Sequence, residues 1–266
     1  MPLAVCATPI GNLEDVTLRV LDELRTADVV LAEDTRHTRL LLERHDISTR
    51  LLSYHEHNEA ARVAELLPRL EAGERMALVS DAGLPGVSDP GARLVRAARD
   101  AGIEVTVLPG PSAVDTALVT SGLAELRYAF LGFLPRRTAE LEGLWRELEA
   151  WPWPVVAFES PQRLPRSLRS LAAADPERPV AVCRELTKRY EEVVRGAAAE
   201  VAERFHEPPK GEVTIVIGAP GRRGDPVAAQ AAVAELVAAG TPRRVAADVV
   251  ARLTDMSRND LYRASL

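Results

Sequence analysis

The sequence predicts an α/β protein with two domains and a helical C-terminal tail. Three observations support this fold class. Short apolar runs alternate with helical patterns, the alternation restarts after Gly122, and only helical patterns follow a Gly- and Pro-rich segment at 218–226. We therefore expect α/β domains at residues 1–122 and 123–218, followed by a linker and helical tail at 219–266.

In the first domain, short apolar runs bounded by turn residues have the length of buried strands. They lie at residues 3–7, 29–32, 51–53, 76–79 and 104–108. The helical patterns between them cover residues 17–24, 38–44, 59–72 and 92–101, and Gly102 closes the last one. This alternation is typical of a parallel sheet with crossover helices.

The second domain is a smaller and more irregular α/β unit. Its predicted strands lie at residues 128–131, 155–158, 180–183, 193–194 and 213–217. Its predicted helices lie at residues 138–150, 163–173 and 197–205. The tail contains helical patterns at 227–239, 242–253 and 257–266.

Composition narrows the function classes. The chain has 266 residues, 47% of them hydrophobic, and no apolar run long enough to cross a bilayer, so we expect a globular cytoplasmic protein with no membrane partner. Cys6 and Cys183 lie in separate strand-like runs, which indicates buried thiols and a reducing compartment. A net charge of -6 disfavours indiscriminate coating of nucleic acid but permits local basic patches.

Polar residues directly follow the predicted strands. In open α/β sheets, ligands bind at the carboxyl ends of strands, so these residues predict a crevice where the two domains meet. They are Thr8 and Asn12, Glu33 and Asp34, Ser80 and Asp81, Ser112, Glu159, and Arg184 with Glu185.

The turn-rich loops at 8–12, 80–91 and 109–113 favour a small ligand. They contain neither a Gly-x-Gly-x-x-Gly after a strand nor a Walker-type motif, so dinucleotides and nucleoside triphosphates are disfavoured. They offer backbone amides, small hydroxyls and the carboxylates of Asp81 and Asp89. That donor set suits a nucleoside-like ligand without phosphates.

Seven motifs occur in an order that matches one known family. They are 8–13 (TPIGNL), 32–38 (AEDTRHT), 80–83 (SDAG), 108–112 (LPGPS), 132–135 (GFLP), 158–161 (FESP) and 184–188 (RELTK). Over residues 3–266, the sequence resembles the ribosomal RNA small-subunit methyltransferase I family of the tetrapyrrole methylase superfamily. The resemblance implies a homodimer with S-adenosylmethionine between the domains. It also implies methyl transfer to the ribose 2′-hydroxyl of a cytidine in the decoding region of 16S ribosomal RNA.

The resemblance also implies a set of cofactor contacts. Leu84 stands where a threonine is common, and Gln162 stands where a histidine is common, so an imidazole at 162 is not expected to be indispensable. The implied cofactor-binding residues are Pro9, Ile10, Gly11, Ser80, Asp81, Ala82, Gly83, Leu84, Ser112, Ala113, Phe158 and Thr214.

Candidate catalytic residues are those able to accept the hydroxyl proton. Lys188 is one of only two lysines among 33 basic residues, and it would act as a base if Arg184 and Arg189 lowered its pKa. The other candidates are the carboxylates of Glu33, Asp34 and Glu185. The structural alternatives are a helix N-cap role for Asp34 and an ion pair for Glu185 with Arg184 or Lys188.

Arginines recur on predicted helices and loops, where the alternatives are RNA contacts and solvated helix faces. We expect the tail to pack on the body and to present arginines to RNA phosphates, with the assembled small ribosomal subunit as the substrate. The candidate RNA-binding residues are Arg36, His37, Arg136, Arg163, Arg189, Arg244 and Arg258.

Two further functions remain open, and a metal site is not expected. The alternative substrates are a tetrapyrrole or corrin precursor, or the diphthamide intermediate. The alternative class is a DNA-binding regulator, because residues 242–266 are spaced like a helix-turn-helix. His55, Glu56 and His57 lack a third histidine or a cysteine at a useful spacing for a metal ion.

Overall fold

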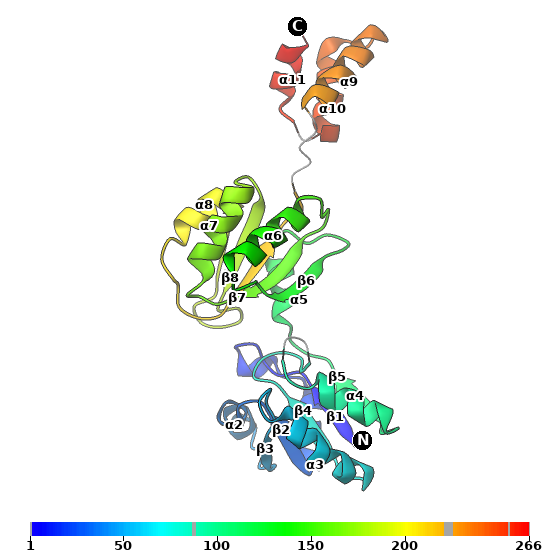
Figure 1. Ribbon diagram of the computed structural model, residues 1–266, viewed down its shortest axis with the longest axis vertical. Coiled ribbons are helices and arrows are strands. Elements are labelled where there is room, and N and C mark those ends of the chain that lie inside the picture. The colour runs from blue at the N-terminus through cyan, green and yellow to red at the C-terminus, as the bar shows by residue number, and fades with distance from the viewer. Residues whose placement is uncertain (1, 87–88, 221–225, 255, 266) are drawn as a thin grey trace.

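The first of two β-sheets lies at the N-terminal end of the molecule (Figure 1). The computed structural model describes residues 2–86, 89–220, 226–254 and 256–265. The sheet is parallel throughout, in the order β3-β2-β4-β1-β5. Its strands are β1 (Leu3–Cys6), β2 (Val29–Ala32), β3 (Leu51–Ser53), β4 (Met76–Val79) and β5 (Val105–Leu108). The predicted α/β fold class and the parallel arrangement are confirmed.

Helices cover both faces of this sheet, so its central strands β1, β2 and β4 are buried throughout. Alternate strand residues enter two cores: Ala4 and Cys6 join the cluster beneath α1 and α2, and Leu3 and Val5 join the cluster beneath α3 and α4. The helical elements are η1 (Leu13–Asp15), α1 (Leu18–Thr26), α2 (Thr35–Arg44), α3 (Glu59–Glu71) and α4 (Ala92–Asp100).

The helix α5 (Ala113–Thr120) connects the two sheets and was absent from the sequence-based prediction. Ser112 caps its N-terminus by accepting a hydrogen bond from the Asp115 backbone N–H. Its buried residues Val114, Ala117 and Leu118 pack against Val156, Ala181 and Val216 of the second sheet. The helix that ends the predicted first domain therefore belongs to the core of the second sheet.

The second sheet is mixed, in the order β6-β7-β10-β8-β9. Only β6 and β7 are parallel, whereas β10 is antiparallel to both of its neighbours and β9 is antiparallel to β8. The strands are β6 (Ala129–Phe133), β7 (Val155–Glu159), β8 (Pro179–Arg184), β9 (Glu192–Ala197) and β10 (Val213–Ile217). One face packs on α5, and the other packs on α6 (Thr138–Glu149), α7 (Leu164–Ala174) and α8 (Ala198–Arg204).

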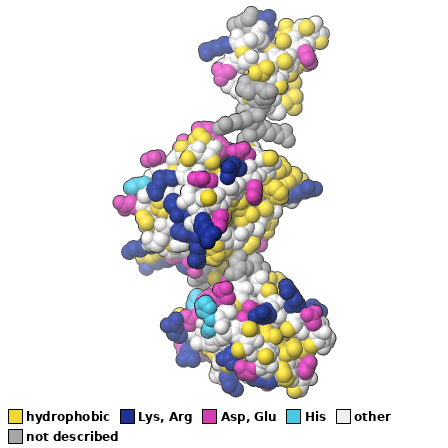
Figure 2. Space-filling model, in the orientation of Figure 1, with side chains coloured by type: hydrophobic (Ala, Val, Ile, Leu, Met, Phe, Trp, Pro, Cys, Tyr) yellow, Lys and Arg dark blue, Asp and Glu magenta, His cyan; other side chains and the backbone are white. Residues whose placement is uncertain are grey.

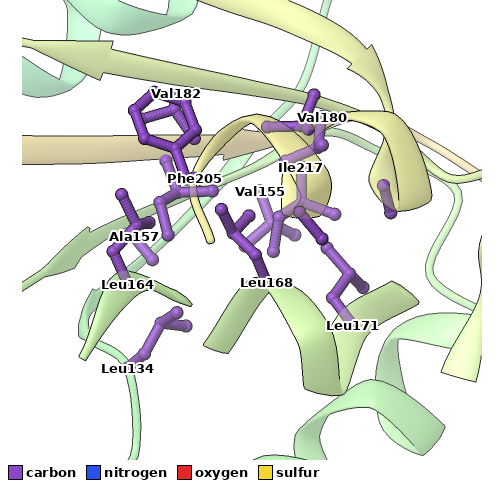
Figure 3. Close-up of a cluster of buried hydrophobic side chains, with 14 of the residues drawn as sticks. Leu134, Val155, Ala157, Leu164, Leu168, Leu171, Val180, Val182, Phe205 and Ile217 are labelled. Carbon is purple, nitrogen blue, oxygen red and sulfur yellow. The ribbon is translucent and has the colours of Figure 1, made fainter. Parts of the chain in front are cut away.

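Leucine, isoleucine and valine side chains fill the core beneath α6, α7 and α8 (Figure 3). Val155, Val180, Val182 and Ile217 of the sheet meet Leu168 of α7 there. The two cysteines lie in other clusters, and burial raises the pKa of each thiol to about 12.

The C-terminal tail forms a separate helical unit, α9 (Pro226–Ala238), α10 (Arg243–Thr254) and α11 (Arg258–Ala264) (Figure 1). Val233, Ala246, Val250 and Leu261 bury one another in its core. The expectation that the tail packs on the body is wrong for the described residues. No hydrophobic cluster among them contains residues of both tail and body, and the two lie apart in Figure 1. Residues 221–225 of the predicted linker lie outside the described residues. The predicted domain boundaries stay predictions.

Candidate functional site

Three loops converge at the carboxyl end of the first sheet, and Gly83 lies at their meeting point. The Thr8 N–H donates to the Gly83 carbonyl (2.8 Å), and the Gly83 N–H donates to the Thr8 carbonyl (3.1 Å). Gly83 has a φ of 80°, and a Cβ there would lie 3.7 Å from the Pro111 carbonyl oxygen and 3.8 Å from the Ile10 side chain. Loops 8–12 and 80–86 are therefore hydrogen-bonded at Gly83, and loop 109–112 passes close beside them, where a side chain at residue 83 would fill the space.

A small open pocket lies beside this meeting point. It contains three residues predicted to contact a cofactor, Pro9, Ser80 and Asp81, together with His37, which was predicted to contact RNA. The complete lining is Thr8, Pro9, Leu13, His37, Thr38, Leu41, Ser80 and Asp81. Acidic and histidine side chains gather at the end of this domain that faces the second domain (Figure 2).

The carboxylates near the pocket have different electrostatic environments. Burial, followed by the negative charge of Asp81, raises the pKa of Glu33 above its ordinary value. Burial, followed by the charge of Glu33, raises the pKa of Asp89 to about 7. Hydrogen bonds from the Arg36 side chain and backbone N–H lower the pKa of Asp34. The site therefore combines carboxyl groups of raised and lowered pKa, a combination common at functional sites.

Asp34 has the geometry of a helix cap. Its carboxylate accepts from the Arg36 N–H at the start of α2 (2.8 Å) and forms an ion pair with the Arg36 guanidinium (2.6 Å). Its own N–H donates to Asp81 Oδ1 (3.0 Å). These contacts commit Asp34 to shaping the loop between β2 and α2, which is the structural alternative weighed for it.

Across the junction, Lys188 is held by two carboxylates. Its Nζ donates to Glu185 Oε1 and to Glu212 Oε2, each at 2.8 Å. Burial alone would lower the pKa of Lys188, but these two acceptors outweigh burial and raise it. The expected lowering of this pKa by Arg184 and Arg189 is wrong, because Arg184 pairs with Glu192 and the groups bonded to Lys188 are anionic.

Glu185 is fixed from two sides. Hydrogen bonding from Lys188 lowers its pKa, and the Glu212 N–H donates to Glu185 Oε1 (3.0 Å). Glu185 has a φ of 54°, a left-handed conformation that is uncommon outside glycine. Gly211 has a φ of 91°, which favours glycine, and a Cβ there would also displace the Glu185 side chain. Glu212 was missed by the sequence analysis because it precedes the predicted strand at 213–217, whereas only residues that follow a strand were expected at the site.

The two halves of the site touch directly. The Asn12 N–H donates to Thr187 Oγ1 (3.0 Å). A Cβ at Gly11 would lie 2.5 Å from Lys188 Cγ and 2.7 Å from the Leu186 carbonyl oxygen. Loop 8–12 of the first domain and loop 185–188 of the second therefore meet only because residue 11 has no side chain.

An apolar cluster joins predicted cofactor residues from both sheets. Ile10, Ala82 and Ala113 pack in it together with Phe158 and Leu186. The Phe158 ring also contacts the rings of Phe130 and Phe133 edge-on, with centroid distances of 5.0 and 5.6 Å. Thr214 is buried opposite Phe158 on β10. Leu84 instead packs on the core beneath α3 and α4, so it lies apart from this cluster.

The predicted RNA-binding residues fall into three groups. Arg36, His37, Arg136 and Arg189 are exposed on loops or helix ends of the body. Arg163 is half-buried, pairs with the fully buried Glu159 carboxylate and donates to the Leu134 carbonyl, so it supports the fold of this loop. The last two, Arg244 and Arg258, lie in the separate tail and are not brought to the body.

The described residues contain neither a cluster of metal ligands nor a membrane-spanning helix. Within the described ranges, no group of three or more histidine, cysteine, aspartate or glutamate side chains is arranged to hold a metal ion. Among the helices in the same ranges, none combines the length and apolar composition that crossing a membrane requires.

Comparison with known proteins gives matches along nearly the whole chain. A family model described as Tetrapyrrole (Corrin/Porphyrin) Methylases matches residues 2–202. Proteins named "Ribosomal RNA small subunit methyltransferase I" from Mesorhizobium japonicum and Streptococcus pyogenes serotype M1 are 42% and 39% identical, over 99% and 98% of this chain and 91% and 93% of their own lengths. The relative of that name from Thermotoga maritima is 44% identical over 81% of this chain and 97% of its own length.

Solved structures share the fold at lower identity. The methyltransferase CobJ has a TM-score of 0.63 at 20% identity, covering 82% of this chain and 94% of its own. Diphthine synthase has a TM-score of 0.62 at 15% identity, covering 81% and 89%. A uroporphyrin-III C-methyltransferase from Thermus thermophilus, solved with S-adenosyl homocysteine, has a TM-score of 0.56 at 20% identity, covering 81% and 96%. These likenesses concern the fold alone.

Proposed function

The chain belongs to the ribosomal RNA small-subunit methyltransferase I family of the tetrapyrrole methylases, and from this premise we propose its reaction. It transfers a methyl group from S-adenosylmethionine to the ribose 2′-hydroxyl of a cytidine in the decoding region of 16S ribosomal RNA. The observation that carries the proposal is 39–42% identity over 98–99% of the chain to proteins named for small-subunit ribosomal RNA methylation. The tetrapyrrole alternative is supported by the description of the matching family model and by solved structures of 20–22% identity, and the diphthamide alternative by a solved structure of 15% identity, all below the identity to the ribosomal RNA methyltransferases.

The loops around Gly83 fit S-adenosylmethionine. Close backbone approach at Gly83 leaves amide and carbonyl groups along loops 8–12, 80–86 and 109–112, which suit the polar edges of a nucleoside. The cluster of Ile10, Ala82, Ala113 and Phe158 offers apolar surface beside them. We assign Pro9–Gly11, Ser80–Gly83 and Ser112–Ala113 to the binding of this cofactor, with Phe158 and Thr214 from the second sheet. When bound, S-adenosylmethionine supplies an activated methyl group.

Of the four predicted catalytic residues, Glu33 is the one whose environment favours accepting a proton, because the pKa values of Asp34 and Glu185 are lowered and Lys188 is held as an ammonium. A general base works best when its pKa lies near the working pH, and burial and Asp81 move the pKa of Glu33 in that direction. Lys188 is already protonated and bound by two carboxylates, so its ammonium can bind an anionic substrate group but has no free electron pair for a proton. In this proposal, Glu185 and Asp34 position Lys188 and the α2 loop.

The exposed basic groups beside the site supply RNA contacts. These groups are a small set, Arg36, Arg136 and Arg189, and the chain as a whole carries a net charge of -6. A surface of this kind gains little from counterion release on a naked strand, so recognition must depend on shape. We therefore propose the assembled small subunit as the substrate and the cytoplasm as the place of reaction.

An apolar surface supports the proposed homodimer. Its residues come from the edge strand β5 of the first sheet, from α5, and from the edge strand β6 of the second sheet with the segment before it. Large side chains are exposed along it, with Leu126 fully exposed, and hydrophobic atoms gather over the region of β6 in Figure 2. Its residues are Val107, Val119, Leu126, Tyr128, Leu131 and Phe133. Phe133→Glu should convert a dimer to a monomer in analytical ultracentrifugation.

Methyl transfer to three substrates tests the function. Purified protein and labelled S-adenosylmethionine are incubated with small subunits, with free 16S ribosomal RNA and with a tetrapyrrole precursor, and products are mapped by mass spectrometry. We expect one methylated cytidine ribose, formed fastest on the subunit. Methylation of the tetrapyrrole alone would overturn the function, and faster reaction on free RNA would overturn the assignment of the subunit. Double-stranded DNA binding without any transferase activity would favour the regulator.

A further inference from the structure

A tyrosine and an arginine lie together at the tip of the loop that carries Lys188. Tyr190 is 67% exposed, and the Arg189 guanidinium lies 5.5 Å from the centre of its ring. The two residues occupy the central positions of a turn closed by the Glu191 N–H, which donates to the Lys188 carbonyl (3.1 Å). They are thus adjacent in sequence to the residue that meets the first domain at Gly11.

Hydrogen bonds within residues 185–191 fix the conformation of this loop tip. The Lys188 N–H donates to the Glu185 carbonyl (3.0 Å), and the Thr187 N–H donates to the Glu191 carboxylate (2.6 Å). Glu185 and Thr187 both have positive φ values, 54° and 64°, in residues for which this conformation is unfavourable. Hydrogen bonds thus stabilise a loop in which two residues have an unfavourable backbone conformation, as is common at functional sites. This ordered loop exposes the Tyr190 ring to solvent.

The rest of the loop leaves this pair available. Its acidic groups are occupied: Glu185 and Glu212 hold Lys188, Glu191 holds the Thr187 N–H, and Glu192 pairs with Arg184. Within the described part of the chain, Arg189 has no ion-pair partner, and the Tyr190 hydroxyl has no hydrogen-bond partner. In the same residues, the interaction that their side chains do make is the one between the Arg189 guanidinium and the Tyr190 ring.

We propose that Tyr190 and Arg189 form a stacking site for an unpaired nucleobase next to the nucleotide that is methylated. Sequence-specific RNA readers stack unpaired bases on aromatic rings and on guanidinium planes, and both surfaces are present here. A base gripped at this tip would fix the RNA beside Lys188 and the domain junction, where the ribose hydroxyl must be placed accurately. This inference rests on the proposed function and adds a base-binding subsite to it.

The test compares Tyr190→Ala with Tyr190→Phe. Loss of one stacked base should raise the KM for small subunits about tenfold, whereas phenylalanine keeps the ring and should stay within about twofold of the unchanged protein. Arg189→Ala should raise the KM less than Tyr190→Ala does. It should also reduce the slope of log affinity against log salt concentration for subunit binding by about one. Leu18→Ala, at an 80% exposed position on α1, serves as a surface control and should change nothing.

Three further readouts separate the possible outcomes. S-adenosylmethionine affinity by calorimetry and the thermal transition should match in all variants, which shows that the fold and the cofactor site are intact. An unchanged KM in Tyr190→Ala, equal losses in the alanine and phenylalanine variants, or a change of sedimentation coefficient in Tyr190→Ala would each overturn the subsite. If the unchanged protein methylates no RNA, the proposed function fails instead, and binding of cofactor-free protein to subunits still tests Tyr190.

Discussion

The two sheets deliver residues to the site in different ways. In the first sheet all strands are parallel, so every loop that follows a strand emerges at the same edge, and Thr8, Glu33 and Ser80 meet there. In the second sheet β10 is antiparallel to β8, so the carboxyl end of β8 meets the amino end of β10. That reversal brings Glu212, which precedes a strand, against Glu185 and Lys188, which follow one.

A rule derived from parallel sheets therefore finds only the half of such a site that the parallel sheet contributes. Where strands run in one direction, polar residues after each apolar run mark the site. Where one strand is reversed, the residues before that strand also contribute, and sequence order does not reveal which strand it is. The first sheet should accordingly hold the proton acceptor and most cofactor contacts, and the second should hold the charged group formed by Lys188, Glu185 and Glu212.

The largest effect should come from Glu33 in the parallel sheet. Glu33→Gln removes the proposed proton acceptor, and general-base catalysis typically contributes about 10²–10⁴-fold, so kcat should fall by that range. In the unchanged protein, Glu33 must be ionised to accept a proton, so activity should be lost as the pH falls through its raised pKa. Single-turnover methyl transfer measured across pH provides both results.

Glu56→Gln is the matched control, because Glu56 is an exposed carboxylate in the same domain. It should leave both kcat and the pH profile unchanged. If Glu33→Gln retained full activity with the same pH profile, the proton acceptor would not be Glu33, and the division of roles between the two sheets would need revision.

The next effect should come from the contact between the sheets, at Gly11. A Cβ in Gly11→Ala would lie 2.7 Å from the Leu186 carbonyl oxygen, and this backbone atom moves only with its loop. Overpacking of this kind typically costs about 1–3 kcal/mol, so the free energy of unfolding should fall by that amount in a denaturant titration. Activity should also fall as the Asn12–Thr187 hydrogen bond is lost.

Gly143→Ala makes the same chemical change within helix α6. There the nearest neighbour of the new Cβ is a flexible Arg146 nitrogen at 4.0 Å, so stability should rise by about 0.5–1 kcal/mol through helix propensity. Equal effects of the two alanines would mean that the junction tolerates a side chain and that the two halves do not depend on close contact.

A smaller effect should come from the cap of α5, the helix that leaves the first sheet and packs on the second. Ser112→Ala removes the acceptor for the Asp115 N–H and should reduce the free energy of unfolding by about 1 kcal/mol, measured without cofactor. Ser257→Ala removes the equivalent cap of α11 in the tail and should leave the unfolding transition of the body unchanged. A shift of that transition by Ser257→Ala would show that tail and body unfold together.

Much of the fold was predictable because the buried strands are continuous apolar runs, as residues 29–32 and 76–79 show. Helix α5 was missed because its apolar residues do not form a single stripe: Val119 is 72% exposed, while Val114 and Leu118 are buried. A signal was present nonetheless, since Ser112 followed three residues later by Asp115 is a helix-start pattern.

Within the site, the meeting of loops 8–12 and 80–83 followed from strand order and was confirmed by the bonds between Thr8 and Gly83. The ionic state of Lys188 could not be predicted, because it depends on Glu212, which lies 24 residues away and is delivered by a reversed strand. The role of Arg163 was equally hidden, since its partner Glu159 is buried only once α7 has packed. Pairings of this kind depend on tertiary contacts.

The smallest stability effect should come from Arg36, at the edge of the parallel sheet. Its ion pair with Asp34 is short, at 2.6 Å, but the Arg36 side chain is 90% exposed, so water and salt screen the pair. Arg36→Ala should therefore leave the free energy of unfolding unchanged within the error of a denaturant titration, because Asp34 still caps α2 through the backbone N–H of residue 36. If Arg36 contacts RNA, the KM for small subunits should instead rise several-fold and the salt dependence of binding should fall by about one charge. A large loss of stability with an unchanged KM would place Arg36 in the fold of the α2 loop and remove it from the RNA surface.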